Sequence, residues 1–321
     1  MRFISSLILA SLAAFMSSTT SAQDYPNRAV KLVVTLPAGG ATDAVARLLA
    51  TSLDKTWKQP IVVENRPGGG QLIAGEFVKN SVPDGYTLIM FAHSLSYEDL
   101  LTQTTYNPVT DMTPMAMIAG SGYVLSVPAA LPINNFRELI AYSKANPGKI
   151  NEGTVGPTGV AEFQKLWKDL NADITKVPYK GGALIVPALT ANEIQLYTAS
   201  PPDVFQLSKA GRVRPIAYSE TQRHPMYPDV QTISESGMGL NNFEARYYFA
   251  IAGPAGVPAA IVAKVNAGVA TAVDAAEVKD KLSQFGMRPY KETPERTRAI
   301  ILGTRTGAQA MIAAGILKPN N

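Results

Sequence analysis

Short hydrophobic runs alternate with segments of helical periodicity along the first third of the chain. Residues 30–36 form a β-rich run that ends in the turn Pro37-Ala38-Gly39-Gly40, and branched residues then recur at helical spacing: Val45, Leu48, Leu49 and Leu53. Further strands are predicted over residues 61–64 and 87–91, with a glycine-rich turn and a helix between them. This succession of strand, turn and helix predicts a parallel α/β unit.

The same alternation starts again after Tyr123. We predict strands over residues 123–127, 150–154, 194–198, 214–218 and 247–252. A second glycine-rich turn, residues 153–159, precedes a helix, and residues 257–314 have mainly helical periodicity. The chain is therefore expected to form two α/β units, and the helical tail, which has no sheet of its own, has to pack on one of them.

The first residues have the features of a secretory signal peptide. Arg2 precedes an apolar stretch, residues 3–16, and small residues follow it up to Ala22. The apolar stretch is shorter than the ~20 residues that a membrane-spanning helix requires. We expect residues 1–22 to be removed, leaving a soluble protein outside the cytoplasmic membrane.

Composition excludes several classes of function. The 321 residues include no cysteine and two histidines, which excludes disulfides and leaves little for a metal site. A net charge of +4 is mild, and no basic block alternates with aromatic residues, so nucleic-acid binding is not expected. The motifs of serine hydrolases, zinc proteases, P-loop proteins and dinucleotide-binding enzymes are absent from the sequence. We predict no catalytic residue, no cofactor and no metal.

Two glycine-rich turns remain as candidate chemistry, one in each predicted unit. Residues 37–40 and 153–159 each join the end of a strand to the start of a helix. Backbone N–H groups at a helix N-terminus can bind a carboxylate or phosphate without a positive side chain. Alternatively, the glycines only allow tight turns that need positive φ. The pair of turns favours an anion held between the two units.

Several segments together identify a family. They are YPNR (25–28), VTLPAGGATD (34–43) with Arg47, VENRPG (63–68), PDGYTL (83–88), VPYKGG (177–182) and PAGVP (254–258). In this order they resemble the tripartite tricarboxylate transporter receptors, also called Bug proteins, over residues 25–315. The resemblance implies a periplasmic solute-binding protein of the Venus-flytrap type: two doubly wound α/β lobes with a ligand cleft between them.

The resemblance also implies domain boundaries and partners. Lobe 1 would comprise residues 23–126 plus 245–321, and lobe 2 residues 127–244, with crossings near Ser126 and Ala245. The ligand would be a small carboxylate, and the partners would be the large and small permease subunits of a transporter or, alternatively, a membrane sensor. We expect a monomer that acts as a receptor and not as an enzyme; a carboxylate lyase using His93 or Asp43 is the less favoured alternative.

The candidate ligand-binding residues follow from the same resemblance. The first carboxylate would be bound by the turn of lobe 1 and the turn of lobe 2, with a hydroxyl from the loop after the third strand. These residues are Ala38, Gly39, Gly40, Asp43, Ser94, Thr154, Gly156 and Thr158. Apart from the resemblance, His93 is placed beside the predicted cleft, where it either donates to a ligand oxygen or caps its own loop. Ala199 stands in a segment where many relatives have an aspartate that would pair with a ligand ammonium, which counts against amino-acid binding.

Two further departures from the family pattern bear on the ligand. Arg246 and Tyr247 stand where small residues are usual, so we predict that the guanidinium binds a second carboxylate beside flat aromatic walls. This favours a dicarboxylate, aromatic or with an extended apolar spacer. Alternatively, Arg246 pairs with Glu244 at the lobe junction. Glu162, in the first turn of a predicted helix, is interpreted as a solvated acid.

Overall fold

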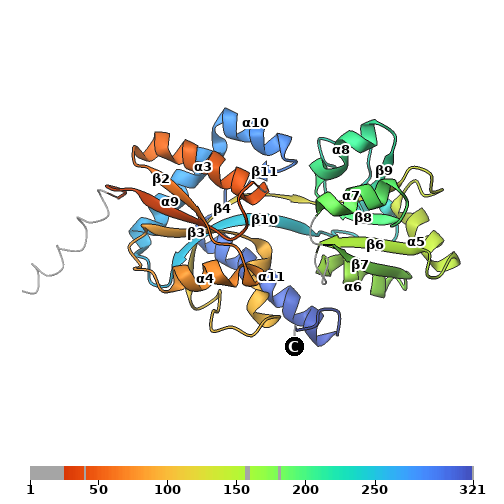
Figure 1. The fold of residues 1–321 in the computed structure, drawn as a ribbon, viewed down its shortest axis with the longest axis horizontal. Helices are drawn as coiled ribbons and strands as arrows, with labels where there is room; N and C mark the ends of the chain where they lie inside the picture. Colours follow the sequence, from red (N-terminus) through yellow and green to blue (C-terminus); the bar gives the residue numbers. More distant parts are fainter. Residues whose placement is uncertain (1–24, 40, 156–159, 180–181, 320–321) are drawn as a thin grey trace, which may run out of the picture.

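A computed structural model describes residues 25–39, 41–155, 160–179 and 182–319 as two α/β lobes joined by two crossing segments (Figure 1). Each lobe is built on its own sheet. The sheet of lobe 1 has six strands: β1 Val30–Val34, β2 Ile61–Asn65, β3 Thr87–Ala92, β4 Met112–Gly122, β10 Arg246–Pro254 and β11 Arg288–Pro289. The sheet of lobe 2 has five: β5 Val124–Pro128, β6 Ile150–Val155, β7 Ile174–Tyr179, β8 Leu196–Ala199 and β9 Val213–Tyr218.

The sheet of lobe 1 has the order β11-β4-β10-β3-β1-β2 and is mixed, not parallel as the sequence predicted. Strands β1, β2 and β3 run parallel, whereas β10 is antiparallel to β3 and to β4. The strand β10 comes from the region after lobe 2, so the chain returns to complete the first sheet. The carboxyl ends of β1 and β3 point towards lobe 2 (Figure 1).

Helices cover both faces of this sheet. Along β1, Leu32 packs in the hydrophobic cluster that contains helix α3 (Ala41–Trp57) and helix α9 (Ala259–Asp274). The next residue, Val33, packs in the cluster on the opposite face with helix α4 (Leu72–Lys79) and helix α11 (Pro294–Ala313). This alternation follows from the two-residue period of a strand and confirms the doubly wound arrangement.

Lobe 2 is a second mixed sheet, in the order β7-β6-β8-β5-β9. Strands β6, β7 and β8 are parallel, and β5 is antiparallel to β8 and β9. Its helices are α5 Phe136–Ala145, α6 Ala161–Asp169, α7 Gly182–Thr190 and α8 Pro201–Lys209. A capping pair opens α5, where the Asn135 side chain accepts a hydrogen bond from the Glu138 N–H.

The two crossing segments lie side by side. Strand β4 ends at Gly122 and β5 starts at Val124, so the chain changes sheets at Tyr123. The predicted crossing near Ser126 is therefore late, because Ser126 already lies within β5. The return at Ala245 lies directly before β10, and Ser219 bonds to both crossings: Tyr123 N–H donates to its hydroxyl at 2.7 Å, and Ala245 N–H donates to its carbonyl at 2.9 Å.

The C-terminal segment returns to lobe 1 but is not wholly helical. Between helix α10 (Ala276–Gln284) and α11, the short strand β11 pairs with β4. Short 3-10 helices are also present in the described segments: η1 Gly69–Gln71, η2 His93–Ser96, η3 Glu98–Leu100 and η4 Ser234–Ser236. Among the described residues, no single helix has the length and hydrophobicity of a membrane span, although α9 and α10 reach them together across a bend of 72°.

Candidate functional site

The turn after β1 is shaped by Asp43, in the first turn of α3. Its buried carboxylate accepts hydrogen bonds from Gly39 N–H at 2.9 Å, Arg47 Nε at 3.0 Å and Asn65 Nδ2 at 3.0 Å. The Arg47 and Gly39 hydrogen bonds lower the pKa of Asp43 to about 2. Ala38 and Gly39 are exposed at the tip of the turn, and the predicted Gly40 lies outside the described residues. The structure therefore assigns Asp43 an internal role, and it engages the Gly39 N–H that was predicted to bind the anion.

Gln71 connects this turn to the loop that follows β3. Its side-chain oxygen accepts from the Thr35 hydroxyl at 2.5 Å and from Ala92 N–H at 3.2 Å, while its amide nitrogen donates to the Ser94 hydroxyl at 2.5 Å. The residue has a φ of 81°, in the left-handed region. Sequence reasoning missed Gln71. Its position in the sequence could have indicated it, because Gln71 directly follows three glycines and such turns often contain residues of positive φ.

His93 and Ser94 open the 3-10 helix η2. The imidazole lies between two rings, with centroids 6.3 Å from Tyr97 and 5.9 Å from Tyr248. Burial lowers the pKa of His93 to about 4, so the ring is neutral at pH 7. Its Nδ1 atom is buried and has no hydrogen-bond partner among the described residues. A buried polar atom of this kind is costly unless a ligand or a water satisfies it.

Aromatic side chains fill the junction beside the crossings. The ring of Tyr123 lies 5.4 Å from that of Tyr247 and 6.2 Å from that of Phe163, on helix α6 of lobe 2. The Tyr247 hydroxyl is buried close to the side chains of Ser121 and Ser200. Tyr123 was predicted as part of a strand and not as a site residue. Its ring contacts both lobes because the residue lies where the chain changes sheets.

Lobe 2 presents the carboxyl ends of β6 and β8. Thr154, near the end of β6, and Ala199, the last residue of β8, are both buried. Beneath them, the fully buried Glu152 accepts hydrogen bonds from Thr198 at 2.7 Å and from Trp167 at 3.0 Å. The predicted Gly156 and Thr158 lie outside the described residues. Thus Thr154 and Ala199 are brought to the same edge of the sheet, as the parallel pairing of β6 and β8 requires.

Arg246 and Tyr247 lie on opposite faces of β10. Arg246 and Tyr248 line one pocket, whereas Tyr247 packs in the cluster that contains α3 and α9. The aromatic wall predicted beside Arg246 is therefore supplied in this pocket by Tyr248 and not by Tyr247, because neighbouring residues of a strand point to opposite sides. Arg246 forms an ion pair with Glu244, the alternative that the sequence left open. This guanidinium is already neutralised within the protein.

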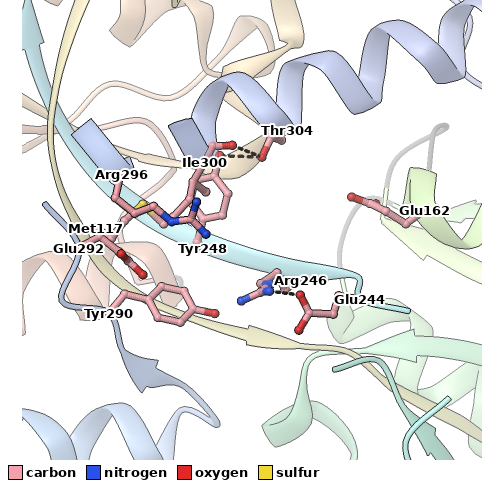
Figure 2. Close-up of a pocket in the computed structure, with 10 residues that line it drawn as sticks. All are labelled: Met117, Glu162, Glu244, Arg246, Tyr248, Tyr290, Glu292, Arg296, Ile300 and Thr304. Carbon is pink, nitrogen blue, oxygen red and sulfur yellow. Dashed lines mark hydrogen bonds and ion pairs between the residues drawn. The ribbon is translucent and has the colours of Figure 1, made fainter. Parts of the chain in front are cut away.

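The pocket beside Arg246 has a volume of about 240 Å³ and lies between the lobes (Figure 2). Strand β10 and helix α11 contribute half of its lining residues, and Glu162 approaches from α6 of lobe 2. Glu162 lies in the first turn of α6, as predicted, but it is only partly exposed, and burial raises the pKa of its carboxyl. Within the described part of the chain, no group of three or more acids and histidines could bind a metal ion.

Comparison with known proteins identifies the family. The family model "Tripartite tricarboxylate transporter family receptor" matches residues 45–315, most of the chain. The chain belongs to the tripartite tricarboxylate transporter receptor family. Protein BugT of Bordetella pertussis is 29% identical, over 90% of this chain and 89% of that protein. The family predicted from the sequence is therefore confirmed.

Solved structures of similar proteins agree with the two-lobe fold. Rpa4515 of R. palustris, determined with adipate, is 30% identical with a TM-score of 0.78, over 92% of this chain and all of that one. MatC (Rpa3494) of Rhodopseudomonas palustris, with bound malate, is 28% identical with a TM-score of 0.73, over 90% of this chain and all of that one. Members of the family are substrate-binding receptors, so this chain is a receptor and not an enzyme, and a carboxylate lyase is set aside.

Proposed function

We propose that this receptor captures a small dicarboxylate between its lobes in the periplasm. The observation that carries the proposal is the buried His93 Nδ1 at the lobe junction, which has no hydrogen-bond partner among the described residues. It lies beside the carboxyl ends of the parallel strands, where open α/β sheets bind ligands. Two similar proteins hold dicarboxylates, adipate in one and malate in the other. An aromatic or extended spacer between the two carboxylates belongs to the same proposal.

The ligand contacts that we propose come from both lobes. Lobe 1 contributes the exposed turn at Ala38 and Gly39 together with Gly40, and the Ser94 hydroxyl, which Gln71 orients. Lobe 2 contributes the edge at Thr154 and Ala199, with Gly156 and Thr158. Arg246 can reach a second carboxylate only by sharing its charge with Glu244, so its contribution to dicarboxylate affinity is expected to be small.

The cellular setting is also part of the proposal. We infer that residues 1–22, outside the described residues, direct export to the periplasm and are then removed. The mature receptor would act as a monomer and deliver its ligand to the large and small membrane subunits of a tripartite transporter. Family membership supports this assignment.

A thermal-shift screen of the purified mature protein tests the proposal. Adipate, malate, succinate, terephthalate and benzoate are compared with neutral sugars as controls. A ligand at 100 times its dissociation constant should stabilise the folded state by ~2.7 kcal/mol, and its concentration should not fall with time. Stabilisation by no carboxylate, or only by sugars, would overturn the proposed function. Disappearance of the ligand would instead indicate catalysis.

A further inference from the structure

Glu162 is an acid without a counter-charge in the space between the lobes. It lies in the first turn of α6 and lines the pocket formed by β10 and α11 (Figure 2). No described side chain donates a hydrogen bond to its carboxylate or forms an ion pair with it; the only opposing influence on its raised pKa is its own backbone N–H. The surroundings are polar aromatic: the hydroxyls of Tyr97, Tyr123 and Tyr248 are near enough to interact electrostatically with it.

The arginines of the same pocket do not neutralise Glu162. Arg246 is paired with Glu244. Arg296, an exposed residue in the first turn of α11, forms no ion pair with a described residue. Figure 2 shows Glu162 entering from lobe 2, across the pocket from Arg296. The Tyr290 hydroxyl, on the wall of the pocket, is buried beside the guanidinium groups of Arg246 and Arg288. The Glu162 carboxylate is therefore an acceptor that no described side chain uses.

Glu162 is half-buried, and a ligand that displaces water from its carboxylate has to bring a donor, because a carboxylate left without one is costly. A second carboxylate at this point would be repelled, whereas a hydroxyl or an ammonium would be bound. We propose that Glu162 is a specificity-determining residue that selects carboxylates with a hydrogen-bond donor on the carbon chain, as in hydroxy acids and amino acids. This inference rests on the proposed function and narrows its ligand class. It also supplies from α6 the acid that the segment at Ala199 lacks.

Three four-carbon dicarboxylates that differ in one substituent provide the test. Succinate has no donor, malate has a hydroxyl and aspartate has an ammonium. Calorimetric titration of the wild-type receptor should give at least tenfold tighter binding of malate or aspartate than of succinate, because a site with an unpaired acceptor discriminates against a ligand that cannot satisfy it. Equal affinity for all three would overturn the inference and leave the proposed function intact.

Two variants of Glu162 identify which donor is recognised. In Glu162→Ala, the affinities for malate and aspartate should fall to that for succinate, while the affinity for succinate should be unchanged or higher. Glu162→Gln keeps an acceptor oxygen but not the charge, so it should spare a hydroxyl ligand and weaken an ammonium ligand at least tenfold. The matched control Arg296→Ala removes a charge from the opposite wall and should leave the ranking of the three ligands unchanged.

The remaining outcomes are also decisive. An equal loss of affinity for all three ligands in both Glu162→Ala and Arg296→Ala would mean that the two residues stabilise the closed lobes. The specificity role of Glu162 would then be wrong. Binding of adipate with no binding of malate or aspartate would overturn it as well, since adipate has no donor on its chain. Failure to bind any carboxylate would overturn the proposed function itself.

Discussion

At the scale of single residues, Asp43 illustrates how an acid beside an anion site can serve the backbone. Its carboxylate takes three donors, from Gly39, Arg47 and Asn65, and lies at the N-terminus of α3, where a negative charge is favoured. These interactions fix the path of the turn whose tip, Ala38 and Gly39, is exposed. A turn fixed in this way needs little further ordering when a ligand binds.

Asp43 should therefore contribute stability that depends on pH. Its folded-state pKa, about 2, lies below the ordinary value of 3.8, so the contribution is complete above about pH 4 and is lost as the pH falls towards 2. Urea unfolding should show a stability difference between wild type and Asp43→Asn that is largest at pH 5 to 7 and disappears near pH 2. Asp169→Asn, at an exposed ion pair on α6, is the control. A difference that stays constant with pH would contradict the assignment.

The residues of the turns could be predicted from the sequence, but several of their partners could not. Glycine-rich turns and the Asn135 cap depend on neighbours in the chain, so local patterns reveal them. Gln71 bonds to Thr35 and Ser94, which are distant in sequence, so local patterns do not reveal these contacts. The pairing of Arg246 with Glu244 was one of two alternatives, and only the path of the return crossing decides between them. That Glu162 has no ion pair with a described residue depends on the packing of both lobes and is not visible in the sequence.

At the scale of elements, helix α11 braces the loop that carries His93 and Ser94. Arg305, on α11, makes two parallel hydrogen bonds to Asp99, at 2.5 and 2.8 Å, and a third to the carbonyl of Ser96 at 3.3 Å. The Tyr248 hydroxyl lies between the hydroxyls of Ser96 and Thr304, at 3.2 and 3.1 Å. The loop is thus attached to both the sheet and the C-terminal helix.

Removing the Arg305 side chain should lower the free energy of unfolding far more than removing that of a surface arginine. The Arg305 and Asp99 side chains are only 12% and 9% exposed, so Arg305→Ala leaves a buried carboxylate unpaired and should cost roughly 3 to 5 kcal/mol in urea unfolding. The control Arg28→Ala breaks a pair that is 63% and 36% exposed and should cost less than about 1 kcal/mol. Similar losses in the two variants would show that the brace contributes little.

The sequence predicted most of the strands and the parallel direction of β1 to β3 and β6 to β8, but it missed some strands and the antiparallel pairs. Strand β4 was missed because methionine and alanine, which favour helices, fill much of Met112–Gly122. Strand β7 was missed because it is an edge strand of alternating partial exposure. Alternation of strands and helices indicated parallel sheets, but β10 enters its sheet from the opposite direction because the chain first builds lobe 2.

At the scale of the whole molecule, the C-terminal helix also connects the lobes away from the crossings. Ala308 and Met311 of α11, together with Leu317, pack against Leu101 of lobe 1 and Ala161 of lobe 2. Lys168, on α6, donates to the Ala314 carbonyl at 3.0 Å. Figure 1 shows α11 running from lobe 1 towards α6. Any opening of the lobes that moves α6 away from α11 has to expose this apolar cluster, so the cluster favours the closed arrangement.

Shortening Met311 should shift the receptor towards an open arrangement. Met311→Ala removes apolar contact from the cluster, so the ligand-free variant should have a larger radius of gyration than the wild type in small-angle scattering, and its carboxylate affinity should fall. Saturating ligand should return both proteins to the same smaller radius, because the ligand contacts both lobes only when they are closed. Leu302→Ala, on an exposed part of the same helix, is the control and should change neither quantity. An unchanged radius in Met311→Ala, with weaker binding, would place its effect in the brace of the ligand loop instead of in lobe closure.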